Sequence, residues 1–363
     1  MAMWLRKIGL FFLGSPICFA SIGGYMPGDG IPREKECLPP WFTGPLLTPS
    51  GHVVPIDYIN VEPYWFYTVT TGSYGSDGDS FSTPNFTTSN FQLPVFIGLT
   101  EWMDILVIGQ AEWNETRGVS SLEFGETIVE LDFQLLHDTR HNTLPGVKVY
   151  ASQLFPTGRF EKRDAGKFGT DISGGGTFKT TIGMVITRTF ELWDCHYFSA
   201  RANGFFILPT KVDVQGINTY GGAPDTNATV KPGMGFGGLV GLEYNLSRNW
   251  AFAIDLQAMY ENKTTFKGFP GTNPDQTLAT LDAPSNFQFS IAPAIEYNFN
   301  AQVGVIGGIW FSLAGRNSPR FISGAIAINY FGPLTHKTIE EKHRFRQSGG
   351  GSSPSGAGGG GGR

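Results

Sequence analysis

Carboxylates recur at alternate positions of apolar segments in this chain, and they are the side chains with the clearest chemical potential. In WAFAIDLQAMYE (residues 250–261), Asp255 and Gln257 belong to one set of alternate residues, while Phe252 and Leu256 belong to the other. Successive side chains of a β-strand point to opposite faces. The acid and the amide would therefore share one face, and the large apolar residues the opposite face.

The same alternation, applied to every such segment, gives a set of polar residues that would share one side of a sheet. An excess of acids around a narrow passage would attract cations and disfavour anions. Alternatively, Lys148 and Arg201 pair with some of the acids and hold a filled interior together. Paired acids alone do not indicate hydrolysis, because a polar interior produces such pairs by chance. The set is Glu62, Asp104, Glu112, Glu130, Asp132, Lys148, Lys179, Arg201, Glu243, Asp255, Gln257 and Glu296.

Histidines offer little support for catalysis. A hydrolase needs a His close to a Ser or a carboxylate, but every His here falls in a terminus or a short connection. His137 and His141 lie beside Asp138, where a metal could bind, although exposed turn histidines are the simpler interpretation. We therefore expect no enzyme, no cofactor and no metal. The histidines are His52, His137, His141, His196, His336 and His343.

The composition excludes a helical membrane protein. Only 16% of the residues are charged, against about 25% in a typical soluble domain. The mean hydropathy is nevertheless −0.09, and beyond the N-terminus no stretch approaches the roughly 20 apolar residues that a transmembrane helix needs. The net charge is −5, and we expect no nucleic-acid partner.

Period-two patterns predict an all-β chain of about twelve strands. Their centres lie near residues 64, 95, 108, 131, 150, 182, 202, 241, 256, 293, 307 and 326. Long and short connections alternate between them: GSYGSDGDSFSTPNFTTS reads as a long loop and LTEWMD as a tight turn, then TRGVSSLEFG as an open loop. This alternation predicts a transmembrane antiparallel β-barrel of the bacterial outer membrane. A soluble β-sandwich would seldom combine such loop asymmetry with so little charge.

In a bilayer every backbone polar group must be paired within the protein, so the sheet must close on itself. The apolar face would meet lipid, and the acids would line the lumen. Trp250 and Tyr260 would occupy the two interfacial aromatic girdles. Proline removes a ladder donor, so Pro63 and Pro293 indicate local bulges or breaks in the strand pairing.

The chain divides into four predicted parts. Arg6 and Lys7 precede an apolar stretch and a cleavage point after Ala20, the layout of a secretory signal peptide; an uncleaved anchor is the alternative. The Pro/Gly-rich segment that follows is either a periplasmic leader or a plug in the lumen. The tail is a flexible Gly-rich linker by composition, either native or appended. The parts are 1–20 (signal peptide), 21–56 (leader or plug), 57–331 (barrel) and 332–363 (tail).

Two cysteines follow the predicted cleavage point. Cys37 lies in the leader and Cys195 in the short connection TFELWDC, on the same side of the membrane in the predicted topology. An exported pair can form a disulfide. A bridge between Cys37 and Cys195 and two separate free thiols both remain open.

Two motifs resemble a known family. VKVYASQLFPTGRF is a strand that ends in Pro-Thr-Gly before a long loop, and GLTEWMDILVIG is a tight turn between two strands. Both are similar to the barrel family of transporters assigned to the MetA pathway of phenol degradation, over residues 57–331. The resemblance implies an outer-membrane barrel with a role in the passage of small, often hydrophobic compounds. The leader and the Gly-rich tail depart from the family pattern.

The sequence thus predicts an outer-membrane channel or passive transporter with an acid-rich lumen. Its expected partners are outer-membrane lipid and small solutes. Whether the chain forms a homo-oligomer stays an open question at this point. The long connections, especially 156–175, 209–232 and 264–285, would control entry. The second hypothesis is a surface-exposed adhesin or structural barrel that acts through its loops. An outer-membrane enzyme is the third.

Overall fold

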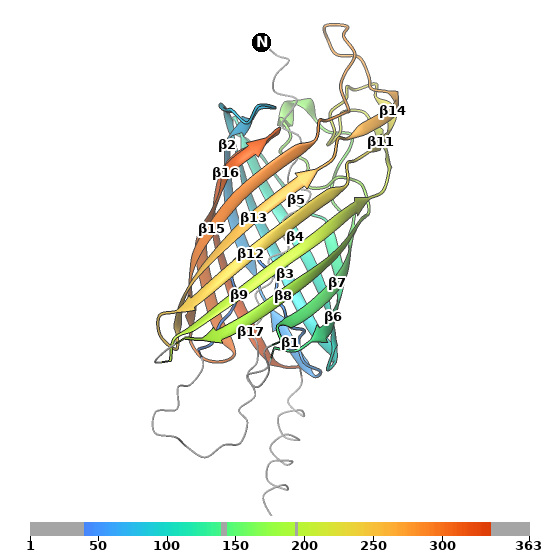
Figure 1. Ribbon diagram of the computed structural model, residues 1–363. Helices are drawn as coiled ribbons and strands as arrows, with labels where there is room; N and C mark the ends of the chain where they lie inside the picture. The colour runs from blue at the N-terminus through green and yellow to red at the C-terminus, as the bar shows by residue number, and fades with distance from the viewer. Residues whose placement is uncertain (1–39, 139–143, 193–194, 335–363) are drawn as a thin grey trace, which may run out of the picture.

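The computed structural model describes residues 40–138, 144–192 and 195–334. They form a closed antiparallel β-barrel (Figure 1). Within these ranges no helix has the length and apolar character to cross a bilayer. The wall strands are β1 (Tyr58–Val61), β2 (Tyr64–Tyr74), β3 (Ser80–Thr100), β4 (Met103–Thr116), β5 (Val119–Phe124), β6 (Thr127–Leu136), β7 (Gly146–Phe155), β8 (Lys179–Glu191), β9 (Tyr197–Pro209), β12 (Gly235–Asn245), β13 (Trp250–Glu261), β15 (Asn286–Asn298), β16 (Val303–Arg316) and β17 (Ser318–Pro333).

These strands fill twelve positions in the wall, because two positions are each shared by two strands. β1 and β2 both lie between β17 and β3, and the break between them falls at Glu62 and Pro63. β5 and β6 both pair with β4, with the break at Gly125 and Glu126. The prediction of a twelve-stranded all-β barrel is confirmed, and Pro63 marks a break in pairing as expected.

The two faces of the wall differ in chemistry as the alternation predicts. In β13, Phe252 is exposed and Ile254 and Leu256 are partly exposed, whereas Asp255 and Gln257 are buried. Exposed apolar side chains continue around the barrel, as with Phe91 on β3. A closed sheet with an apolar exterior satisfies every backbone donor internally and leaves the polar set inside.

Two predicted loops are strands instead. β2 and β3 extend through the polar stretch after residue 70 and meet in a turn at 75–79, and β4 and β5 meet at Arg117 and Gly118. Arg117 has a φ of 52° and Gly118 a φ of 76°, so the turn needs residues that tolerate left-handed backbone. The β2–β3 tip is mostly polar and exposed, so its composition marks a hairpin in water here, not a loop. The β4–β5 hairpin carries the exposed apolar side chains Trp113, Leu122 and Phe124 on one face.

Three connections at the same end are long, as predicted. The 156–178 loop holds a 3-10 turn, η3 (Ala165–Lys167). The other two contribute β10 (Val212–Gln215), β11 (Asn227–Lys231) and β14 (Thr265–Phe269), which form a separate three-stranded sheet. We call this the long-loop end. Short turns, such as 246–249 and 299–302, lie at the opposite, short-turn end.

Candidate functional site: the barrel interior

All twelve polar residues predicted to share the interior face are buried. Five of them are completely buried: Glu130, Asp132, Lys148, Asp255 and Glu296. They come from strands all around the barrel, so the interior is lined by charge and not by an apolar core. Eight of the twelve are acids and three are bases.

A stretch of chain before the first strand also lies inside the barrel. We call residues 40–57 the inner segment. Leu46, Leu47 and Thr48 are 0% exposed. The two leucines pack against small interior side chains such as Ala253 and Ala292. Most of the described part of the predicted leader or plug is thus enclosed by the wall, and the segment becomes exposed again at Ile56, just before β1.

Interior carboxylates on one side hold the inner segment by its backbone. Thr43 donates to Glu296 Oε2 from its N–H (3.0 Å) and its hydroxyl (2.8 Å). The N–H groups of Leu47 and Thr48 donate to the two oxygens of Asp255 at 3.0 Å and 2.9 Å, and the Thr48 hydroxyl donates at 2.5 Å. Side-chain acceptors therefore replace the strand ladder that this segment lacks.

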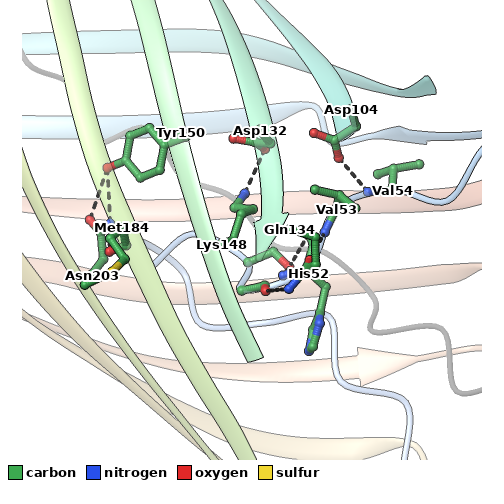
Figure 2. Close-up of polar contacts among 12 residues, drawn as sticks. His52, Val53, Val54, Asp104, Asp132, Gln134, Lys148, Tyr150, Met184 and Asn203 are labelled. Carbon is green, nitrogen blue, oxygen red and sulfur yellow. Dashed lines mark hydrogen bonds and ion pairs between the residues drawn. The ribbon is translucent and has the colours of Figure 1, made fainter. Parts of the chain in front are cut away.

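The opposite side of the wall holds the segment in the same way (Figure 2). Val54 N–H donates to Asp104 Oδ2 at 2.5 Å, and Val53 N–H donates to Gln134 Oε1 at 2.9 Å. Gln134 returns a hydrogen bond from Nε2 to the carbonyl of Gly51 at 3.0 Å. Because Asp104 is on β4 and Asp255 on β13, the inner segment crosses the interior from wall to wall.

Glycines on the interior face make room for this crossing. A Cβ at Gly241 would lie 2.6 Å from Pro45 Cγ, and a Cβ at Gly98 would lie 2.6 Å from the carbonyl oxygen of Val54. A glycine inside a strand often marks a close approach of other backbone. That signal is present in the sequence and could have located the crossing, as could Gln134, an inward amide that the predicted set omits.

The interior bases are paired with acids. Lys148 Nζ lies 2.8 Å from Asp132 Oδ2 (Figure 2), and both side chains are almost completely buried. Arg201 lies 3.1 Å from Glu243 Oε2. The structure thus contains the pairing that the alternative interpretation of Lys148 and Arg201 predicts. Within the described chain, Asp104, Glu130 and Asp255 form no ion pair.

Glu130 is the most exceptional of these acids. It is completely buried on β6, and neither carboxylate oxygen has a hydrogen-bond partner among the described residues. Its nearest charged neighbours include Asp132, Asp104 and Lys148. Three carboxyl groups near one ammonium make this part of the interior attractive to a positive charge.

The 156–178 loop covers the long-loop end of the interior. Asn114 Nδ2 donates to the carbonyl of Ile172 at 3.0 Å, and Gly175 N–H donates to Glu126 Oε1 at 2.8 Å. Inside the loop, the buried Asp171 lies 3.6 Å from Arg159 and 3.7 Å from Arg163. The interior is therefore narrowed at two levels, by this loop and by the inner segment.

His52 is the one histidine of the inner segment. Burial lowers its pKa to about 4, and the positive charges of Arg201, His137 and Lys148 act in the same direction. The imidazole is therefore neutral near pH 7. His137 and His196 lie at the short-turn end, and His141, His336 and His343 lie outside the described residues. The described chain contains no cluster of His, Cys, Asp and Glu able to hold a metal.

Cys195 is disulfide-bonded. Its carbonyl accepts a hydrogen bond at 3.0 Å from Nδ2 of Asn245, the last residue of β12. In the 246–249 turn that follows, the Arg248 guanidinium lies 4.1 Å from the centroid of the Trp41 ring. The predicted partner, Cys37, lies outside the described residues.

Comparison with known proteins supports the fold. No family model matches the chain, and no curated protein matches it. Among solved structures, it is similar to the COG4313 outer membrane channel from Pseudomonas putida F1, with 13% identity and a TM-score of 0.61 over 78% of this chain and 98% of that one. The NanC porin (10% identity, TM-score 0.36) covers 74% of this chain and 98% of its own.

The closed wall and its likeness to the COG4313 channel define the class of fold: the chain is a twelve-stranded β-barrel of the outer-membrane type. The resemblance to transporter-type barrels in the sequence is supported at the level of the fold.

Proposed function

We propose that the protein is a passive channel that carries small solutes across the outer membrane, with an interior that favours cations. The observation that carries the proposal is the charge inside the closed wall, where eight predicted carboxylates are buried with three bases. In a narrow passage with low-dielectric walls, such an excess raises the local concentration of cations.

The two constrictions limit the size of the solute. The inner segment crosses near the short-turn end, and the 156–178 loop covers the other end. We infer that only small solutes pass while both are in place, and that the acids act on whatever path remains between them.

The test is the reversal potential of the full-length protein in a planar bilayer under a KCl gradient. Glu112→Gln/Glu130→Gln removes two interior charges that accept no hydrogen bond from the inner segment, since Glu112 accepts from Asn90 (3.0 Å). We expect the cation preference to decrease. Glu101→Gln/Glu115→Gln removes the same charge from exposed positions and should leave the preference unchanged.

Two outcomes would overturn the proposal. One is an anion preference of the unmodified protein. The other is a lack of conductance in a chain without residues 21–56, because removal of the inner segment should enlarge any passage that exists.

A second candidate function is a surface-exposed adhesin. The three-stranded sheet of β10, β11 and β14 favours it, because this sheet has its own apolar core, including Val214, Val230 and Leu281. Loops that only connect strands do not need such a core. Cell binding that survives Glu112→Gln/Glu130→Gln but is lost on deletion of 209–232 would support this function over the channel.

A further inference from the structure

The three-stranded sheet stands above the wall strands β9, β12 and β13 and continues their order (Figure 1). β10 follows β9, β11 precedes β12, and β14 follows β13. The small sheet is thus an upward extension of one sector of the wall.

One face of this sheet is buried. Val212, Val214, Ala228 and Val230 pack with Leu281 and with Phe160 of the 156–178 loop. That loop reaches inward to Asn114 and Glu126. The buried face is therefore directed over the barrel opening, and the opposite face points away from the barrel axis.

Four lysines lie on or beside the outward face, which we call the lysine face: Lys211, Lys231, Lys263 and Lys267. All four are exposed. The pairing Val212↔Val230 places Lys211 beside Lys231, and the pairings Thr229↔Lys267 and Lys231↔Thr265 place Lys267 on the neighbouring strand. Within the described chain none of the four forms an ion pair.

Three acids accompany them, of which Glu161 accepts a hydrogen bond from the Gln215 N–H of β10 at 3.0 Å. Asp213 Oδ1 accepts a hydrogen bond from the Thr229 hydroxyl at 2.6 Å, and Asp282 precedes Ala283, which bridges to Thr264. Four lysines against Asp213, Asp282 and Glu161 leave the lysine face positive, although the whole chain carries a net charge of −5.

A row of aromatic side chains lies below the lysine face. Phe206, Phe236 and Tyr260 are exposed on β9, β12 and β13. The ring centroids of Phe206 and Phe236 are 5.4 Å apart, and those of Phe236 and Tyr260 are 6.2 Å apart. Exposed aromatic rows mark the membrane interface of such barrels.

The spacing between the two rows fits a lipid headgroup layer. Lys211 follows Phe206 by five residues, and Lys231 precedes Phe236 by five. Five residues span roughly 16 Å of strand, or about 12 Å along the membrane normal at a tilt of 35–45°. Lysine side chains reach downward from that height toward the headgroups.

We propose that the lysine face binds the phosphorylated headgroups of outer-leaflet lipid. Ammonium groups pair with phosphate as point charges, and each basic residue held at an anionic membrane surface strengthens binding about fivefold. Because the lysine face lies above the aromatic row, a lipid bound there can also pack its acyl chains against the apolar wall below. A free anion lacks this contact, so the site should bind the lipid more tightly.

The test uses the full-length protein in detergent and bicelles of zwitterionic lipid doped with diphosphorylated lipid A. The variant is Lys211→Gln/Lys231→Gln/Lys263→Gln/Lys267→Gln. We expect it to bind the doped bicelles roughly 600-fold more weakly at low salt, which is about fivefold for each of the four lysines. The matched control, Arg117→Gln/Lys167→Gln/Arg316→Gln/Arg320→Gln, removes the same charge elsewhere at the long-loop end and should bind normally.

Further comparisons keep the outcome decisive. The unmodified protein should prefer lipid A over its dephosphorylated form, which tests the proposal even if the variant fails to fold. Equal affinity for both forms, an unchanged affinity of the lysine-face variant, or an equal loss in the control would overturn the proposal. Displacement of lipid A by inorganic phosphate at the same phosphate concentration would show an anion site without lipid specificity and would also overturn it.

Discussion

At the scale of single residues, the interior acids have two different tasks. Asp104, Asp255 and Glu296 accept backbone donors of the inner segment. Glu112 and Glu130 do not contact it through any hydrogen bond within the described chain. Substitutions can therefore separate the retention of the segment from the charge of the passage.

Asp255→Asn tests the first task. The amide accepts less strongly than the carboxylate and adds donors that Leu47 and Thr48 cannot satisfy. We expect the free energy that holds the inner segment inside the barrel to decrease by about 2 kcal/mol. High-conductance events in planar bilayers should therefore become more frequent. Glu112→Gln is the control. Equal event frequencies in the two variants would contradict this role of Asp255.

The lowered pKa of His52 predicts how the stability of the folded protein, with the inner segment in place, depends on pH. Its pKa in the folded protein is about 4, below the usual 6.5, so the unfolded chain takes up the proton first as pH falls. The stability associated with neutral His52 is complete above pH 6.5 and is lost as pH falls toward 4. His52→Phe should therefore reduce the difference in melting temperature between pH 7 and pH 5. The same difference in both proteins would rule out this contribution.

At the scale of elements, the sequence predicts the wall well and the connections less well. Alternation identifies β13 and its lipid-facing side, because one face meets acyl chains and the other polar groups. The tip of β2–β3 does not show this alternation, because most of its residues are polar and exposed on both faces and therefore resemble a loop. In β5 the alternation covers only six residues, with Ser121 against the 156–178 loop and Leu122 exposed, which is too short a pattern to identify a strand.

Alternation does not predict the inner segment either, but for a different reason. Its backbone is satisfied by side chains of distant strands, so its own sequence needs no periodicity. Alternation identifies the interior acids, but it does not identify their partners. The hydrogen bond from Thr48 to Asp255 joins residues that are 207 positions apart in the sequence. The local sequence signal of the inner segment is the set of inward glycines, such as Gly98 and Gly241, which leave room for its backbone.

The disulfide of Cys195 belongs to this scale because it would join two elements. Trp41 contacts Arg248, three residues after Asn245, whose side chain binds the Cys195 carbonyl. Cys37 precedes Trp41 by only four residues, a reach of roughly 14 Å when extended. We predict that Cys37→Ser removes the mobility difference between reducing and non-reducing gels. Cys18→Ser serves as the control. A difference that persists in Cys37→Ser would exclude this bridge.

At the scale of the whole molecule, the closed ring predicts unusual resistance to unfolding in detergent. Eleven wall positions and the β6 part of the twelfth have a paired strand on each side, and only the short β5 hairpin arm pairs on one side, so the ring itself offers no edge at which unfolding can begin. We expect the unboiled protein to migrate differently from the boiled protein in a detergent gel. Identical migration of the two samples, prepared from outer membranes, would contradict a closed barrel.

The break at Pro63 also bears on how the cylinder is completed. The inner segment continues directly into β1, which pairs with both β17 and β3 at the seam between the first and last strands. Sealing this seam therefore encloses the segment in the same event. Any later force that draws the segment out would act first on the seam, where four paired residues of β1 form the anchorage.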